Sequence, residues 1–164
     1  AARFIYLNRT CWNALYRVNL NGQFNVPKGT KDSVLLPTDN FAEVSRKLQN
    51  ARLICCDFEQ QIDEAGDGDF VFADPPYTVK HNLNGFVKYN EKIFSWDDQI
   101  RLRDSLVSAA SRGARILLTN ANHRSIRDLY RHEFNISKAM RHSVIAASAN
   151  KRSQTSELLI SNSV

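Results

Sequence analysis

The stretch FVFADPPY, residues 70–77, decides the fold class of this 164-residue chain. Its first half, residues 70–73, is a short apolar run of the kind that predicts a buried β-strand. Its second half cannot extend that strand, because two prolines in succession supply no N–H donors to a sheet. In open α/β sheets ligands bind beyond the carboxyl ends of the strands, so this tetrapeptide stands where a site is expected.

Strands and helices alternate around this stretch. Further strands are predicted at residues 53–56, 115–118, 134–140 and 156–161, and helices at residues 96–112 and 122–130. Ser95 is expected to cap the longer helix, with acidic residues in its first turn. This alternation predicts an α/β fold, with a mostly parallel sheet and helices on both faces.

The first 50 residues have a different pattern. Apolar side chains at helical spacing predict a helix over residues 3–15, and a short polar helix is expected over residues 39–50 with Thr38 or Asp39 as its cap. We therefore divide the chain into a first segment, residues 1–50, and a second, residues 51–164.

A β-hairpin is predicted between those two helices. Residues 16–19 and 23–26 are short alternating runs, and Asn21-Gly22 between them favours a type I′ turn. Pro27 ends the second run. The first segment is therefore expected to consist of a helix, a hairpin and a short helix.

The composition restricts the partners of the chain. A formal charge of +5 suits a polyanion such as nucleic acid, although many basic proteins bind nothing anionic. No run of about 18 apolar residues predicts a membrane span, and no leader is recognised, so a cytoplasmic protein of bacterial or phage type is expected. The three cysteines and four histidines lack metal-ligand spacing, so we expect no metal site.

The residue types in Asp74-Pro75-Pro76-Tyr77 suit chemistry on an amine. The amino group of adenine is a poor nucleophile, because its lone pair is delocalised into the ring. The Asp74 carboxylate and the Pro75 carbonyl could accept hydrogen bonds from that amine, while the prolines stiffen the backbone. Tyr77 offers a face on which an extruded base can stack. The alternative is an ordinary turn that contains two prolines.

The sequence also resembles the Dam-type (α-group, D12 class) DNA adenine-N6 methyltransferases. The resemblance is carried by residues 6–9, 12–19, 22–27, 74–77, 119–120, 141–144 and 157–160. It implies a partial Rossmann-like methyltransferase sheet, preceded by a target-recognition segment of helix and hairpin. It also implies S-adenosylmethionine-dependent methylation of adenine N6 in double-stranded DNA at a GATC-like site, by base flipping and direct methyl transfer, as in restriction-modification systems.

The resemblance assigns DNA contacts to the hairpin. Arg17 would read a guanine edge, which matches the two hydrogen bonds that a guanidinium makes to O6 and N7. Trp12 would wedge into the base stack, with Asn13 and Leu15 beside it and Pro27 at the far end of the hairpin. Arg141 and Lys151-Arg152 would contact phosphates. Members of the family usually carry glycine where this chain has Ala14, so a positive φ at Ala14 would be strained.

The resemblance also assigns a donor site. Asp57, Phe58 and Asp74 would contact S-adenosylmethionine, and the loop from Asn84 to Phe94 would close over the flipped adenine. The Gly-rich loop and the acidic strand end that hold most of the donor in this family are not found in the sequence. We therefore expect a fragment of a longer protein, a chain completed by a second polypeptide or copy, or a decayed gene product.

Two other functions remain open on the sequence. The chain could be a truncated DNA-binding remnant without turnover, or it could methylate RNA or a protein amide. A groove-reading hairpin argues against the last of these.

Overall fold

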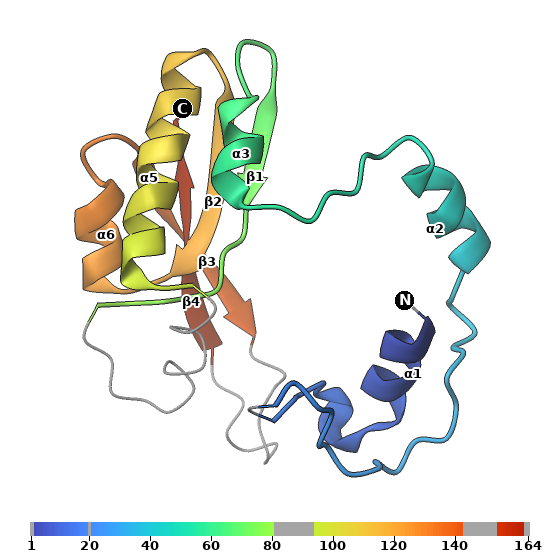
Figure 1. Cartoon of the computed structure of the whole chain (residues 1–164). Helices are drawn as coiled ribbons and strands as arrows, with labels where there is room; N and C mark the ends of the chain where they lie inside the picture. The colour runs from blue at the N-terminus through green and yellow to red at the C-terminus, as the bar shows by residue number, and fades with distance from the viewer. Residues whose placement is uncertain (1, 20, 81–93, 143–153, 163–164) are drawn as a thin grey trace. The chain divides into compact units, whose positions relative to one another are not determined.

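The structure, a computed structural model, describes residues 2–19, 21–80, 94–142 and 154–162. The chain forms two compact units, Ala1–Ile54 and Cys55–Val164. Figure 1 draws the first unit in blue to teal and the second in green to red. The division falls after Ile54, whereas the sequence placed it after Asn50.

The second unit contains a four-stranded sheet. Its strands are β1 (Phe70–Ala73), β2 (Arg115–Ala121), β3 (Asn135–His142) and β4 (Gln154–Ser161), in the order β1-β2-β4-β3. All four strands were predicted, but a mostly parallel sheet was wrong. Only β1 and β2 pair in parallel, and β4 is antiparallel to both β2 and β3. Residues 143–153 are too few for the crossover that a parallel β3–β4 pair would need.

Among the described residues, the helices that pack with this sheet are α3 (Phe58–Asp63), α5 (Trp96–Ser111) and α6 (Arg124–Tyr130). Ser95 caps α5 as predicted: its hydroxyl accepts from the N–H of Asp98, and the Asp98 carboxylate accepts from the N–H of Ser95. Gly113, at a φ of 98°, ends the helix in a conformation that favours glycine. Figure 1 shows α3 and α5 side by side in front of the sheet.

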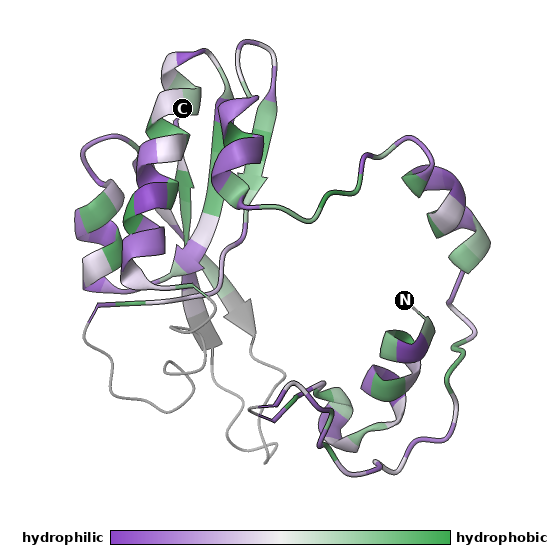
Figure 2. Cartoon of the chain, in the orientation of Figure 1, coloured by the Kyte–Doolittle hydropathy of each residue, from purple (hydrophilic) through white to green (hydrophobic). Residues whose placement is uncertain are grey.

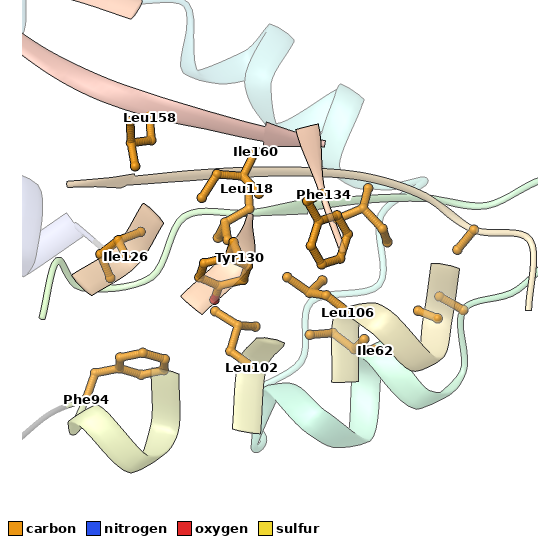
Figure 3. Close-up of a cluster of buried hydrophobic side chains, with 14 of the residues drawn as sticks. Ile62, Phe94, Leu102, Leu106, Leu118, Ile126, Tyr130, Phe134, Leu158 and Ile160 are labelled. Atoms are coloured by element: carbon orange, nitrogen blue, oxygen red, sulfur yellow. The ribbon is translucent and has the colours of Figure 1, made fainter. Parts of the chain in front are cut away.

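The core lies between the helices and one face of the sheet. Leu118 of β2 and Leu158 and Ile160 of β4 point toward Leu102 and Leu106 of α5, as Figure 3 shows, and all five are buried. Figure 2 colours β1 and β2 mainly as hydrophobic, whereas α3 and α5 carry both colours. This contrast is expected of apolar strands that amphipathic helices cover on one face.

The opposite face of the sheet carries apolar side chains that no described element covers. Phe70 and Phe72 on β1 are each 58% exposed, and Leu117 and Leu159 on the neighbouring strands are half-buried. The prediction of helices on both faces is therefore wrong for the described residues. A parallel strand pair is ordinarily covered on both sides, so this sheet has an open face.

The predicted strand at residues 53–56 does not form. Residues 52–55 have no regular secondary structure, and Leu53 and Ile54 are 77% and 41% exposed. A strand needs a neighbour for its backbone groups, and within the described residues β1 pairs only with β2. The outer edge of β1 therefore has no partner strand in the described part of the chain.

The first unit contains two α-helices and an irregular hairpin. Helix α1 (Ala2–Thr10) is shorter than predicted, and a 3₁₀ turn, η1 (Trp12–Ala14), follows it. The helix stops because the chain turns to meet the hairpin: Trp12 N–H donates to Pro27 O at 2.9 Å. Gly29 lies against the backbone of Cys11. A Cβ at this position would be 2.6 Å from the carbonyl oxygen of Cys11, which is too close for any side chain without a shift of the backbone.

The hairpin differs in detail from the prediction. Val18 and Phe24 form its one described bridge, and Gly22 N–H donates to Asn19 O at 3.0 Å. Gly22 has a φ of 75°, but Asn21 does not have a positive φ, so the type I′ turn was wrong. The Asn19 side chain replaces it, since its Oδ1 accepts from the N–H groups of Asn21 and Gln23, both at 3.0 Å.

Helix α2 (Phe41–Leu48) is capped by Asn40 and not by Thr38 or Asp39. The Asn40 side chain accepts from the N–H of Glu43 at 3.0 Å. Asp39 is occupied elsewhere, because its carboxylate accepts from the Arg9 guanidinium and from the N–H of Leu36. This ion pair ties α1 to the loop before α2.

The Arg9–Asp39 pair predicts a pH dependence of stability. Bonds from Arg9 and from the backbone of Leu36 lower the pKa of Asp39 from 3.8 to about 2. A carboxyl whose folded pKa is depressed stabilises above its unfolded pKa, so this contribution is complete above about pH 4 and is lost as the pH falls toward 2. We expect the urea midpoint of the first unit to fall over that interval, and to fall less in Asp39→Asn.

Trp12 fluorescence in a Trp96→Phe background reports on the first unit alone, since Trp12 and Trp96 are the two tryptophans of the chain. An Asp39→Asn variant with the same pH dependence as the parent would contradict the assignment.

Candidate active site at the carboxyl end of the sheet

Asp74-Pro75-Pro76-Tyr77 directly follows β1, as predicted. Asp74 is exposed, the next three residues are half-buried, and Thr78 is fully buried. Because β1 and β2 are parallel, their carboxyl ends meet at one edge of the sheet. Ala73 pairs with Leu118, so the next residue of each strand, Asp74 and Thr119, lie beside one another.

A hydrogen-bonded group forms at this edge. Thr119 Oγ1 donates to Asp74 Oδ1 at 2.5 Å. The Tyr77 hydroxyl contacts the side chains of Thr119 and Glu157 through hydrogen bonds, and burial, with the charges of Glu157 and Asp74, raises the pKa of Tyr77 above its ordinary 10.0. The phenol therefore stays protonated at neutral pH, and its ring is tethered at the hydroxyl end.

A cavity of about 720 Å³ opens next to Asp74. Its lining includes Phe58, Phe70, Phe72, Asp74, Pro75 and Leu102. This volume is within the range of small-molecule sites. The Asp74 carboxylate is exposed and accepts from a hydroxyl, so it is not buried against a cation.

Two of the three residues predicted to contact the donor, Phe58 and Asp74, line this cavity, and Asp57 does not. Asp57 caps α3, accepting from the N–H of Glu59 at 3.0 Å, and its Oδ1 also accepts from Arg101 at 2.8 Å. The ring centroids of Phe58 and Phe94 are 5.7 Å apart, and the Arg101 guanidinium carbon lies 5.0 Å from the centroid of the Phe58 ring. Phe58 is thus held by its neighbours at the wall of the cavity.

A buried glutamine supports the loop from behind. Gln99 Nε2 donates to Thr78 O at 3.3 Å, and Gln99 Oε1 accepts from Asn120 Nδ2 at 3.2 Å. Thr78 Oγ1 in turn donates to Phe94 O at 2.6 Å. The backbone that follows Tyr77 is therefore joined to the ends of β2 and to the start of α5.

The residues predicted to contact DNA are exposed at the hairpin of the first unit. Trp12, Asn13, Leu15, Arg17 and Pro27 are all exposed. Asn13 and Ala14 have φ values of 54° and 53°, so Ala14 does adopt the conformation that favours glycine, at a cost of about 1–2 kcal/mol. Arg17 Nε donates to Asn25 Oδ1 at 3.1 Å across the hairpin.

Other predicted contacts fall at or beyond the limits of the described residues. The backbone of Arg141 belongs to β3, and its side chain is not described. Lys151-Arg152 and the loop from Asn84 to Tyr89 lie outside the described residues. Phe94, the last aromatic residue of that loop, is buried against Phe58.

Thr119, Gln99 and Arg101 are among the residues of the site that had no predicted role. Thr119 could have been found from the sequence, because it directly follows the apolar run predicted as a strand at residues 115–118. Gln99 gives no such signal, since one glutamine on an amphipathic helix is ordinarily exposed.

Within residues 2–19, 21–80, 94–142 and 154–162, no group of three or more His, Cys, Asp or Glu side chains could hold a metal ion. No helix in the same residues is long and apolar enough to cross a membrane.

Comparison with known proteins identifies the family. Residues 1–145 match the family described as D12 class N6 adenine-specific DNA methyltransferase. Type II methyltransferase M.MjaIII of Methanocaldococcus jannaschii is 39% identical over 98% of this chain and 56% of its own length. Type II methyltransferase M1.LlaDCHI of Lactococcus lactis subsp. cremoris is 36% identical over 99% of this chain and 58% of its own length. DNA adenine methylase of Escherichia coli strain K12 is 30% identical over 97% and 57%.

The chain therefore belongs to the D12 class of N6 adenine-specific DNA methyltransferases. It spans 56–58% of the length of these three curated relatives. Methyltransferases of this family use S-adenosylmethionine as the methyl donor.

The buried hydrogen bonds of Gln99 predict a large effect of its removal. In Gln99→Ala the Thr78 carbonyl and the Asn120 amide lose a buried partner, which costs about 1–3 kcal/mol of unfolding free energy. Urea denaturation measures the loss. Gln60→Ala, which changes an exposed glutamine on α3, is the matched control and should remain within about 0.5 kcal/mol of the parent. Equal losses in the two variants would contradict the role of Gln99.

Proposed function

We propose that this chain is the catalytic and target-recognition part of an enzyme that methylates the N6 atom of adenine in double-stranded DNA. The observation that carries the proposal is Asp74, an exposed carboxylate at the end of a strand beside a cavity of about 720 Å³. Membership of an adenine-specific family adds the substrate class.

S-adenosylmethionine, when bound, supplies an electrophilic methyl group on sulfur. The adenine N6 lone pair would form the new bond to the methyl carbon, the carbon–sulfur bond would break with its electrons kept by sulfur, and one N6 proton would leave through the Asp74 carboxylate to solvent. Asp74 and the Pro75 carbonyl accept hydrogen bonds from the amine and favour the pyramidal nitrogen that can attack. Tyr77 stacks on the adenine, which must leave the duplex to reach the cavity.

The donor is proposed to lie against Phe58 and Asp74. Both residues line the cavity, and Phe58 offers an aromatic wall that Phe94 and Arg101 hold in place. Asp57, whose Oδ1 is already bonded to Arg101 and to the N–H of Glu59, contributes through its other oxygen.

DNA is proposed to meet the exposed hairpin of the first unit, at a GATC-like site. Arg17 reads a guanine, Trp12 wedges into the stack, Asn13, Leu15 and Pro27 complete the contact, and Arg141 meets a phosphate. All five of the residues named before Arg141 are exposed, in η1 and the hairpin that follows it, and this exposure supports the assignment. Bacterial DNA, and phage DNA during infection, lie in the bacterial cytoplasm, and the enzyme is proposed to work there.

A further polypeptide segment is proposed to complete the sheet and to hold most of the donor. Within the described part of the chain, the outer edge of β1 has no partner strand and the face that carries Phe70, Phe72, Leu117 and Leu159 is uncovered, and both observations support this proposal. The curated relatives also extend well beyond the matched region. The segment belongs either to the same protein or to a second chain. We call the 164-residue chain joined to that segment the complete enzyme.

Methyl transfer tests the proposal directly. We expect the complete enzyme to transfer labelled methyl groups to a GATC duplex, and Asp74→Ala to reduce the rate at least about 100-fold, because a preorganised acceptor is lost. Asp63→Ala, an exposed carboxylate on α3, is the matched control and should keep the parent rate. Calorimetric titration with the donor, with and without duplex, accompanies the assay. Salt-dependent DNA binding without donor binding or transfer would favour the non-enzymatic remnant instead.

The role of Arg17 is tested by specificity. Arg17→Ala should reduce discrimination at one base pair by about 1–3 kcal/mol, because the two hydrogen bonds to guanine are lost. Competition binding with duplexes changed one base pair at a time measures it, with Arg52→Ala, an exposed arginine of the same unit, as the control. An equal loss of affinity on all duplexes would mean that Arg17 contacts only phosphate.

A further inference from the structure

Thr119 occupies a position fixed by strand register. Side chains alternate along a strand, so Phe72 and Asp74 project from the same face of the sheet. On β2, Leu117 pairs with Phe72, which places Leu117 and Thr119 on that face too. Thr119 pairs in turn with Leu159, and Glu157 lies two residues from Leu159 along β4. Three adjacent strands thus bring Asp74, Thr119 and Glu157 together on the open face.

The hydroxyl of Thr119 has one proton, and the structure shows where it goes. Thr119 Oγ1 lies 2.5 Å from Asp74 Oδ1, and a carboxylate can only accept. The Tyr77 hydroxyl also has a single proton, so it can donate to only one of its two neighbours, Thr119 Oγ1 and the Glu157 carboxylate, at a time. Oδ1 of Asp74 is occupied by Thr119, which leaves Oδ2 to accept from a substrate.

We propose that Thr119 is a positioning residue for the Asp74 carboxylate, because its hydroxyl donates to Asp74 Oδ1 and fixes the orientation of the carboxylate beside Tyr77. The proposal rests on the proposed function of Asp74 and Tyr77. Asp74 is exposed and follows the last residue of a strand, so without this bond its carboxylate could rotate freely. A carboxylate that turns away from the amine loses its effect on catalysis.

The Thr119–Asp74 contact can be measured without any enzyme activity. Asp74→Ala, Thr119→Val and the double variant form a cycle of urea midpoints in the 164-residue chain, followed by Trp96 fluorescence in a Trp12→Phe background. We expect the double variant to lose less stability than the sum of the single losses, because both single changes remove one bond. Additive losses would overturn the proposal.

The positioning role is then tested in the complete enzyme. Thr119→Val should reduce the single-turnover rate of methyl transfer roughly 10- to 100-fold, with the DNA concentration for half-maximal rate changed by less than about twofold. Thr119→Ser keeps the hydroxyl and should recover the rate to within about threefold of the parent. Ser137→Val makes a comparable hydroxyl-to-methyl change on the same face, on β3, and should leave the rate unchanged.

Each outcome decides between the proposals. If the parent enzyme is active, two results would overturn the positioning role of Thr119. In one, Thr119→Val and Thr119→Ser both keep the parent rate. In the other, Thr119→Ser fails to restore the rate that Thr119→Val loses. A parent enzyme that transfers no methyl group, despite non-additive losses in the stability cycle, would overturn the proposed function and leave Thr119 a purely structural link.

Discussion

The parallel pairing of β1 with β2 is the constraint on which the candidate active site depends. It brings the carboxyl ends of two strands to one edge, and its register sets Asp74 beside Thr119. A shift of one residue in this register would turn Thr119 to the helix-covered face and bring Asn120, which bonds to Gln99, to the open one. The core and the site therefore fix each other, since the burial of Leu118 requires the same register that brings the Thr119 hydroxyl to the carboxylate.

Much of this arrangement could be predicted from sequence because it depends on local patterns. The apolar run at residues 70–73, the Ser95 cap and the strand-ending prolines each determine structure within a few residues. The errors arose where distant pairing decides. Residues 53–56 have the composition of a strand but lack a neighbour among the described residues, and β3 and β4 pair antiparallel because the connection between them is too short for a crossover. Asn21 satisfies a local turn rule, but the Asn19 side chain imposes a different turn.

The outcome of the prediction for each site residue likewise depended on contacts between residues distant in the sequence. Phe58 was predicted by family resemblance to contact the donor, and it lies at the wall of the cavity because Phe94 and Arg101 hold it. Asp57 was predicted to contact the donor. In the structure its Oδ1 accepts from the N–H of Glu59 and so caps α3. Gln99 could not be identified at all, since only the fold shows that its amide meets a backbone carbonyl and Asn120 at once.

The open face connects the unfinished sheet with the chemistry. Phe70 and Phe72 form an apolar row on β1, and Asp74 continues this row one step beyond the strand, on the same face. A segment that buried the phenylalanines would also approach the carboxylate and exclude water from it, which strengthens every hydrogen bond made there. Completing the sheet and preparing Asp74 for an uncharged amine would then be one event, and the exposure of Asp74 in the 164-residue chain is the expected state before that event.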